Sequence, residues 1–335
     1  MKAIQYLAPD TIGVNDVPEP SPGPGEVLVE ISFTGICGTD MAIRAGKHPR
    51  AKPPLTLGHE LSGYIRDSNG SDKFCDGDLV TVNPLITCGQ CWSCRNGLDH
   101  ICYNLRLYGI DAPGSMARYM TIPVSNLHRL PESVDKLYGA LAEPLAVGIH
   151  AVNLGNPRSS DRVVVMGAGP IGLITALCLR RKGVANIIVS DVCDFRIKLA
   201  AELGFEAVDV RSKNLKEVVS KWTDGDGADA VYEVSGHSSA VAGMTDVVRC
   251  RGLIMMVSVH KEERPVDLRS VNFKEITLWG SRCYSNHEFA EAVRALEELP
   301  VGKLISHRLP LESAVEGFDA MLHPDTSCKV LFDLQ

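Results

Sequence analysis

The sequence predicts an α/β protein in which a doubly wound, six-stranded parallel sheet is inserted into a mostly β domain. Three observations lead to this fold class. Short apolar runs alternate with helical patterns after about residue 160, and a glycine-rich turn at 167–172 joins the first of these runs to a helix. Before residue 145 the texture is different, with short β-rich runs between Gly and Pro.

The N-terminal part of the chain has the pattern of a compact β domain. Runs such as 27–31 and 79–82 are rich in β-forming residues, and the Gly and Pro between them mark turns and irregular loops. We assign residues 1–147 to this domain. Residues 287–335 are expected to return to it, because a helix at 288–298 is followed by a closing strand at 329–333.

The middle part, residues 148–286, is expected to form the parallel sheet. Helices are predicted at 171–181 and in the stretch that ends at Leu203, and helical segments separate most of the strands. The six predicted strands are 162–166, 187–190, 206–208, 230–234, 253–257 and 276–279. This alternation is typical of a doubly wound sheet with helices on both faces.

The turn at 167–172 has the sequence G-A-G-P-I-G, and its context indicates a dinucleotide site. Gly167 permits the tight turn, Gly169 lets the backbone approach a pyrophosphate, and Gly172 lets the helix pack closely on the sheet. The positive N-terminus of that helix favours phosphate. The motif alone is weak, but here a strand precedes it and a helix and an acidic residue follow.

The acidic residue, Asp191, ends the second predicted strand. A carboxylate at this place accepts hydrogen bonds from ribose hydroxyls and repels a 2′-phosphate, so we expect NAD rather than NADP. Arg196 follows a few residues later and keeps the NADP alternative open.

The composition excludes several classes of protein. The chain of 335 residues has a net charge of −7 and no run rich in Lys or Arg, which argues against nucleic acid as a partner. No apolar run approaches the roughly 18 residues that a membrane helix needs, and residues 1–10 lack the apolar stretch of a signal peptide, so we expect none. We therefore expect a cytoplasmic protein. Its eleven cysteines fit metal ligation and buried thiols better than a disulfide framework.

Four of these cysteines form the pattern C-x2-C-x2-C-x7-C at Cys88, Cys91, Cys94 and Cys102. Four thiolates so spaced can surround a zinc ion as a tetrahedron. Such a site has no position left for water or substrate, so the metal would be structural. An iron–sulfur cluster is the alternative, because short C-x2-C spacings also occur there.

Three further patches lie outside that loop, at 35–40, 58–60 and 143–144. Each is weak alone, because a single Cys is usually a small core residue and a single His-Glu pair or Glu is usually a surface or loop feature. Together with the glycine-rich turn and the four-cysteine loop, they resemble the zinc-containing medium-chain dehydrogenase/reductase superfamily over essentially the whole chain. Within it, the segments 58–63, 142–146 and 280–282 are most similar to the polyol (sorbitol-type), butanediol and sugar-acid dehydrogenases, with threonine dehydrogenases nearby.

The resemblance implies a GroES-like catalytic domain that holds the inserted Rossmann domain, and two zinc ions per chain. It implies that Cys37, His59 and Glu60 bind a catalytic zinc, and that Glu143 binds it directly or through water. Thr39 would pass the alcohol proton outward, and Asp40 would orient a histidine ligand. A catalytic zinc keeps an open position, for which alcohol dehydrogenase is a standard example. The cysteine loop would hold the structural zinc.

The resemblance also implies which residues bind the cofactor, in the cleft outside the carboxyl ends of the strands. These are Gly167, Gly169, Pro170, Ile171, Gly172, Asp191, Arg196, Val257, Ser258 and Arg282. Arg282 has an equally good interpretation as a surface ion pair. The chain departs from many relatives at Ala42, where a proton-relaying His is usual, and this leaves the relay route open.

The function expected from the resemblance is oxidation of a secondary alcohol, such as a polyol, vicinal diol or sugar-like substrate, to the ketone. Zinc would lower the pKa of the hydroxyl and NAD would take the hydride. The alternatives are a sugar-acid or L-threonine-type dehydrogenase, a zinc-free NADPH-linked reductase, and a non-catalytic NAD-binding protein. A homo-oligomer, either dimer or tetramer, is expected by analogy, with strand 276–279 able to pair across a two-fold axis.

Overall fold

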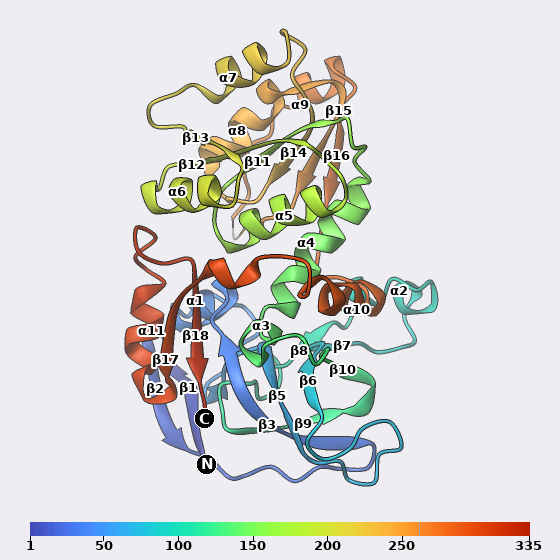
Figure 1. Cartoon of the computed structure of the whole chain (residues 1–335), viewed down its shortest axis with the longest axis vertical. Coiled ribbons are helices and arrows are strands. Elements are labelled where there is room, and N and C mark those ends of the chain that lie inside the picture. Colours follow the sequence, from blue (N-terminus) through green and yellow to red (C-terminus); the bar gives the residue numbers. More distant parts are fainter. Residues whose placement is uncertain (261) are drawn as a thin grey trace. The chain divides into compact units, whose positions relative to one another are not determined.

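The computed structural model of the chain describes residues 1–260 and 262–335, and these residues divide into two compact units. Unit 1 contains Met1–Ala146 and Ser285–Gln335, and unit 2 contains Val147–Tyr284. Figure 1 shows the strands and helices of each unit. No helix among the described residues is long and apolar enough to span a membrane.

Unit 1 is built around a seven-stranded sheet of order β10-β6-β5-β3-β18-β17, with β9 also paired to β3. The long strand β3 pairs antiparallel with β5, β9 and β18, so it ties the C-terminal strand to the N-terminal part. The strands are β3 (Glu26–Gly35), β5 (Glu60–Asp67), β6 (Leu79–Val82), β9 (Tyr119–Pro123), β10 (Leu127–Arg129), β17 (Ile305–Pro310) and β18 (Lys329–Asp333).

Smaller elements complete unit 1. A three-stranded sheet contains β1 (Lys2–Ala8), β2 (Thr11–Asp16) and β4 (Leu55–Thr56), and a two-stranded sheet contains β7 (Leu85–Ile86) and β8 (Arg106–Leu107). The helices are α1 (Gly38–Arg44), α2 (Trp92–Arg95), α3 (Lys136–Gly139), α10 (Asn286–Ala295) and α11 (Ala314–Ala320). Helix α10 begins with a capping box, in which Ser285 and Glu288 satisfy each other's backbone N–H groups.

Unit 2 contains a parallel sheet of order β13-β12-β11-β14-β15-β16. Its strands are β11 (Arg162–Met166), β12 (Asn186–Asp191), β13 (Glu206–Asp209), β14 (Ala228–Glu233), β15 (Val248–Met256) and β16 (Thr277–Gly280). Six parallel strands with helical crossovers confirm the predicted doubly wound fold. Strand β15 begins before the predicted 253, because Val248 already pairs with Ala228, ahead of a register shift and of the polar residues Arg249 and Arg251.

Helices cover both faces of this sheet. In Figure 1, α5 (Pro170–Arg181) and α6 (Asp194–Glu202) lie on one face, and α7 (Leu215–Trp222), α8 (Ser238–Val247) and α9 (Leu268–Phe273) lie on the other. Apolar residues between sheet and helices are fully buried, as at Val164 and Met244. Burial on both faces explains why these strands are continuous apolar runs in the sequence.

Helix α4 (Ala142–Gly155) contributes residues to both units, because their boundary lies between Ala146 and Val147. The pair 143–144 has the sequence of an ordinary loop, yet it forms the first turn of this helix. Proline is tolerated there, since the first turn has no intrahelical partner for its missing N–H. Glu143 is therefore placed by a helix rather than by a loop, and it is buried.

Candidate functional site

The four cysteines of the loop at 88–102 lie together. The Sγ–Sγ distances are 3.4 Å for Cys88–Cys102, 3.5 Å for Cys91–Cys94, 3.9 Å for Cys91–Cys102 and 4.0 Å for Cys88–Cys94. Sulfurs about 2.3 Å from a zinc ion at the corners of a tetrahedron lie about 3.8 Å apart. The cluster has this size, which fits one metal ion better than a larger iron–sulfur core.

The backbone around the cluster favours thiolates. The N–H groups of Cys94 and Tyr103 donate to the sulfur of Cys91 and lower its pKa to about 6. The N–H of Cys88 donates to the sulfur of Cys102 at 3.4 Å. Hydrogen bonds of this kind stabilise the negative charge that metal ligands must carry. Burial and the hydrogen bonds of Cys91 and Cys102 raise the pKa of Cys94 to about 12, so a metal cation is needed to stabilise four thiolates together. The donor set is suited to a closed structural metal site.

A second group of possible ligands consists of Cys37, His59 and Glu60, whose ligand atoms all lie within 4.8 Å of one another. Cys37 is the N-cap residue of α1, and His59 and Glu60 lie at the start of β5. Strand pairing sets this arrangement, because Glu60 pairs with Gly35 at the end of β3, two residues before Cys37. His59 and Glu60 are buried, whereas Cys37 is half-buried.

Asp40 joins the two segments that carry these ligands. Its carboxylate accepts hydrogen bonds from the backbone N–H of Cys37 at 2.9 Å and of Gly58 at 3.4 Å. Its Oδ1 lies 4.0 Å from Nδ1 of His59, beyond hydrogen-bond distance. Burial raises the pKa of Asp40, and the nearby His59 opposes the rise. Asp40 therefore fixes the backbone on both sides of the site.

Close backbone packing fixes the position of His59. Gly58 has a φ of +93°, and a Cβ there would lie 2.7 Å from side-chain atoms of Ser115 and Met116. A Cβ at Gly114 would lie 2.2 Å from the carbonyl oxygen of Gly58. Only glycine fits where backbones approach so closely. Residues 114–116 thus support the histidine.

The surroundings of His59 fit a metal cation. Its Nδ1 atom is buried and has no hydrogen-bond partner among the described residues. Burial lowers the pKa of His59, but the charges of Cys37 and Asp40 outweigh this effect and raise the pKa well above its ordinary value. The site therefore favours a positive charge at the imidazole. A metal ion bound to this imidazole can supply that charge.

Lys329 is a residue beside this site that sequence reasoning missed. Its Nζ forms an ion pair with Oε2 of Glu60 and donates to the carbonyl oxygen of Ile36 at 3.1 Å, and both charged side chains are buried. Gly35 makes the room, since a Cβ there would lie 2.1 Å from Oε2 of Glu60. Burial lowers the pKa of Lys329, but the charges of Glu60 and Cys37 raise it above its usual value.

Three other residues of unit 1 have predicted or questioned roles. Glu143 is close enough to His59 and Lys329 to raise the pKa of both, although it lies outside the 4.8 Å group. Thr39 is half-buried in the first turn of α1. Ala42 is buried in the same helix and offers no proton relay.

Unit 2 contains a cavity of about 810 Å³ at the carboxyl ends of its strands. Gly167, Gly169, Asp191 and Arg196 line it. Gly167 has a φ of +110°, and a Cβ at Gly172 would lie 1.8 Å from the carbonyl oxygen of Gly167. This turn therefore requires glycine at positions 167 and 172. The N-terminus of α5 follows directly, where backbone N–H groups can bind a phosphate.

Asp191 is fixed beside this turn. Its Oδ2 accepts the backbone N–H of Ala168 at 2.6 Å, and its Oδ1 accepts those of Val192 and Cys193 at 2.7 and 2.9 Å. A carboxylate has about four lone-pair positions, so Oδ2 can still accept a ribose hydroxyl. Arg196 lies across the turn, and its Nε is buried without a hydrogen-bond partner among the described residues.

The remaining predicted cofactor residues lie outside the described lining of this cavity: Pro170, Ile171, Gly172, Val257, Ser258 and Arg282. Val257 and Ser258 follow β15, and their N–H groups donate to the carbonyl oxygen of Glu233. The Ser258 hydroxyl donates to the buried carboxylate of Glu233, which also accepts the N–H groups of Ser235 and Gly236. Arg282 is exposed after β16.

Two family models match the chain. Residues 23–132 match the alcohol dehydrogenase GroES-like domain, and residues 170–298 match the zinc-binding dehydrogenase domain. A 2-dehydro-3-deoxy-L-galactonate 5-dehydrogenase from Pseudoalteromonas atlantica is 37% identical, over 96% of this chain and 95% of the relative. An L-threonine 3-dehydrogenase from Stenotrophomonas maltophilia is 34% identical, over 96% of each.

Solved structures are similar over the whole length. A short-chain alcohol dehydrogenase from Escherichia coli CFT073, complexed with NADH, is 28% identical with a TM-score of 0.93, covering 100% of this chain and 99% of that one. A zinc-binding dehydrogenase from Sinorhizobium meliloti 1021, bound to NADP, is 29% identical with a TM-score of 0.93, covering 99% of both chains. Similar chains thus bind either nicotinamide cofactor.

Proposed function

Since the chain belongs to the zinc-binding alcohol dehydrogenases of the medium-chain dehydrogenase/reductase superfamily, we propose that it oxidises a secondary alcohol on a polyol, vicinal diol or sugar-like substrate. The resemblance and the fold predicted from sequence motifs are confirmed. The family uses zinc and NAD(P), and the expected products are the ketone and the reduced cofactor. The zinc-free reductase is disfavoured, because both groups of possible ligands are present.

The proposal depends on the group of Cys37, His59 and Glu60, whose ligand atoms lie close together. Negatively charged groups surround His59, and Cys37 is only half-buried. These three residues would hold the catalytic zinc, with Glu143 binding it directly or through water. A zinc ion there would lower the pKa of a substrate hydroxyl, and NAD would accept the hydride. The four-cysteine loop would hold a second, structural zinc.

The chain's own residues hold and orient these groups. Asp40 fixes the backbone of Cys37 and of Gly58, the residue before His59. The proposed zinc ligands Cys37 and His59 therefore keep their positions. Lys329 balances the charge of Glu60 and orients its carboxylate. The hydroxyl of Thr39, in the first turn of α1, would carry the substrate proton outward, with a route beyond it that does not use residue 42.

For the cofactor we propose NAD in the cavity of unit 2. Gly167, Gly169 and the N-terminus of α5 would bind the pyrophosphate, and Asp191 would accept a ribose hydroxyl through Oδ2. Arg196 would support the phosphates from across the turn. Val257, Ser258 and Arg282 would contact the cofactor beyond this cavity.

The similarity to a sugar-acid dehydrogenase at 37% identity favours a polyhydroxylated acid as one substrate class. The second candidate is L-threonine or another 3-hydroxy acid, favoured by similarity to L-threonine 3-dehydrogenases at 32–34% identity. Both classes carry a secondary hydroxyl near further polar groups. They differ in the amino group, which a polyhydroxylated acid lacks.

NADH formation tests this proposal directly. We expect a polyol, vicinal diol or sugar acid to give NADH from NAD⁺ in the zinc-loaded protein, and a chelator that removes the catalytic zinc to abolish NADH formation. L-Threonine as the preferred substrate would establish the second candidate instead. NADH binding without turnover on polyols, diols, sugar acids and 3-hydroxy amino acids would establish the non-catalytic alternative.

We also propose that the chain forms a homo-oligomer, a dimer or tetramer, through β16. This strand is the edge of the parallel sheet, and its residues Leu278 and Trp279 are exposed. An exposed apolar edge strand is a template for pairing across a two-fold axis. Replacing Trp279 by lysine is expected to lower the mass measured by light scattering. A wild-type mass equal to one 36.3 kDa chain would contradict the proposal.

A further inference from the structure

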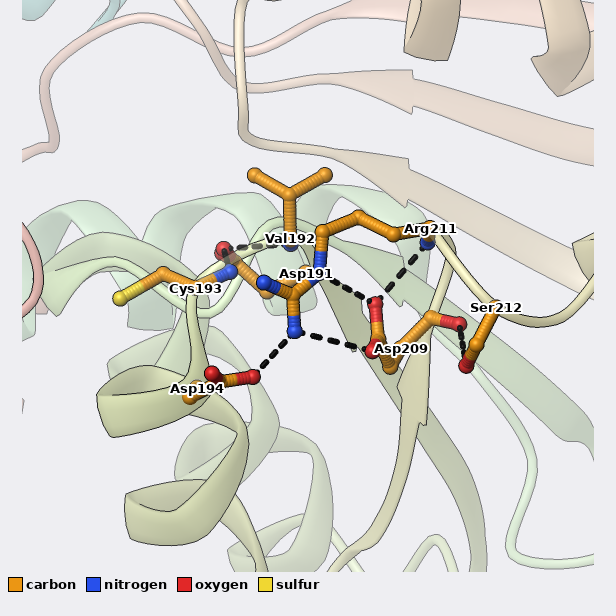
Figure 2. A network of polar contacts seen from close by, with 7 residues as sticks. All are labelled: Asp191, Val192, Cys193, Asp194, Asp209, Arg211 and Ser212. Carbon is orange, nitrogen blue, oxygen red and sulfur yellow. Dashed lines mark hydrogen bonds and ion pairs between the residues drawn. The ribbon is translucent and has the colours of Figure 1, made fainter.

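The residues that follow β13 line one side of the unit 2 cavity, and they include an arginine with two carboxylate partners. Arg211 lines the cavity and is about half exposed, with a side-chain exposure of 48%. Figure 2 shows its guanidinium between Asp209, at the end of β13, and Asp194, at the start of α6. We call Asp194 and Asp209 the carboxylate clamp.

The clamp uses most of the directed donors of the guanidinium. Nε and Nη2 of Arg211 donate to the two oxygens of Asp209, each at 2.9 Å, which is a bidentate pair. Nη2 also donates to Oδ1 of Asp194. The hydrogen bonds from the Arg211 side chain lower the pKa of Asp209 to about 2, and those to Asp209 and Asp194 raise the pKa of Arg211. Bidentate, charge-assisted pairs of this kind are the strong ones.

The clamp lies beside the ribose end of the proposed cofactor site. Strands β12 and β13 are parallel, and Asp191 pairs with Asp209 in register. The N–H of Val210 donates to the carbonyl oxygen of Asp191 at 3.1 Å. Arg211 is therefore two residues from the register partner of the carboxylate that would accept the ribose hydroxyls.

The position matters because NADP differs from NAD by a phosphate on this ribose. An arginine near the acidic residue is the usual device for binding that phosphate, through its planar fork of donors. Arg211 is suitably placed, but its fork already faces two carboxylates. A 2′-phosphate would have to displace them and would meet their negative charge, in addition to that of Asp191.

We propose that the carboxylate clamp of Asp194 and Asp209 withholds Arg211 from a 2′-phosphate and so makes the cavity select NAD over NADP. The inference rests on the proposed function, in which this cavity binds the adenosine end of the cofactor. It adds to Asp191 a second determinant of cofactor choice, formed by residues from another strand and a helix. Arg211 is a cation suited to a 2′-phosphate, and its two carboxylate partners neutralise it.

Binding of the two reduced cofactors tests the clamp without reference to turnover. We expect wild-type protein, titrated with NADH and with NADPH while cofactor fluorescence is followed, to bind NADH at least about tenfold more tightly. The double variant Asp194→Asn/Asp209→Asn should bind NADPH about tenfold more tightly than wild type, with NADH affinity changed less than about threefold. Adding Arg211→Ala should remove the gain for NADPH.

Matched variants separate the clamp from a general charge effect. Glu202→Gln removes one negative charge from the same helix, at an ion pair with Lys198 (3.8 Å), and should leave the NADH/NADPH ratio unchanged. The single variant Asp194→Asn is expected to fold, because the side chain of Asp194 is 82% exposed. Its affinity for NADPH should increase, but by less than that of the double variant.

The outcomes are distinct. An unchanged NADPH affinity in folded variants that bind NADH, or an equal gain in Glu202→Gln, would overturn the role of the clamp. The same holds if wild type binds NADPH as tightly as NADH. If wild type binds neither nucleotide, the assignment of the cavity itself fails, and this inference falls with it.

Discussion

Replacing His59 by alanine is expected to remove one of two zinc ions per chain and to lower kcat/KM for the alcohol on the order of 10³-fold or more. The imidazole is one of three ligand groups that lie within 4.8 Å of one another, so its loss leaves a zinc ion with too few protein ligands. Without the metal, the substrate hydroxyl keeps its high pKa and the hydride step loses its main electrostatic support. Zinc content by mass spectrometry and NADH formation measure the two effects.

A matched control is His323→Ala, because His323 is exposed and distant in sequence from every predicted ligand. This variant should keep both zinc ions and full activity. The His59→Ala variant should also keep the zinc of the four-cysteine loop, which shares no ligand with the first site. A His59→Ala protein that retained two zinc ions and its activity would refute the assignment of the catalytic site.

Much of the fold could be predicted from the sequence, because many strands and turns of both units have local sequence patterns. The strands at Arg162–Met166 and Lys329–Asp333 have the predicted bounds, since each is a short run whose burial makes it apolar. The turn at 167–172 could be interpreted as a dinucleotide site because a strand, the glycines and a helix follow one another along the chain. Such features need no knowledge of distant contacts.

The candidate site was predictable where ligand types and spacing are local, as in the four-cysteine loop. It was not predictable where a partner comes from far along the chain. Lys329 reaches Ile36 and Glu60 from the last strand, and nothing near Lys329 in sequence identifies those partners. One signal was present, since a single lysine beside the apolar residues of a closing strand requires a partner if that strand is buried.

The contacts of Arg211 and Asp40 could not be predicted for the same reason. The interpretation of Arg196 as the residue that keeps NADP open overlooked Arg211, because pairing of β12 with β13 is needed to place Arg211 near Asp191. Asp40 is expected to orient a histidine, and its Oδ1 lies 4.0 Å from Nδ1 of His59, but the two backbone N–H groups that its carboxylate accepts could not be predicted. Side-chain roles that depend on register or on exact hydrogen-bond geometry appear only in the folded chain.

Replacing Lys329 by methionine is expected to lower the free energy of unfolding of the zinc-free protein by about 3–5 kcal/mol. Methionine is unbranched like lysine, one atom shorter and uncharged, so the buried carboxylate of Glu60 loses its ion-pair partner. A buried charge without a partner is costly, whereas removing both charges is much less so. Urea denaturation of the chelator-treated protein measures the loss.

Two comparisons make this prediction specific to the ion pair. The double variant Lys329→Met/Glu60→Gln should regain most of the lost stability in the zinc-free protein, because its remaining amide is neutral. Zinc loading should reduce the effect of Lys329→Met, since a bound cation would compensate the same carboxylate. A loss below about 1 kcal/mol in the zinc-free single variant would show that Glu60 has another compensating partner. A loss of equal size with and without zinc would instead place Glu60 outside the metal site.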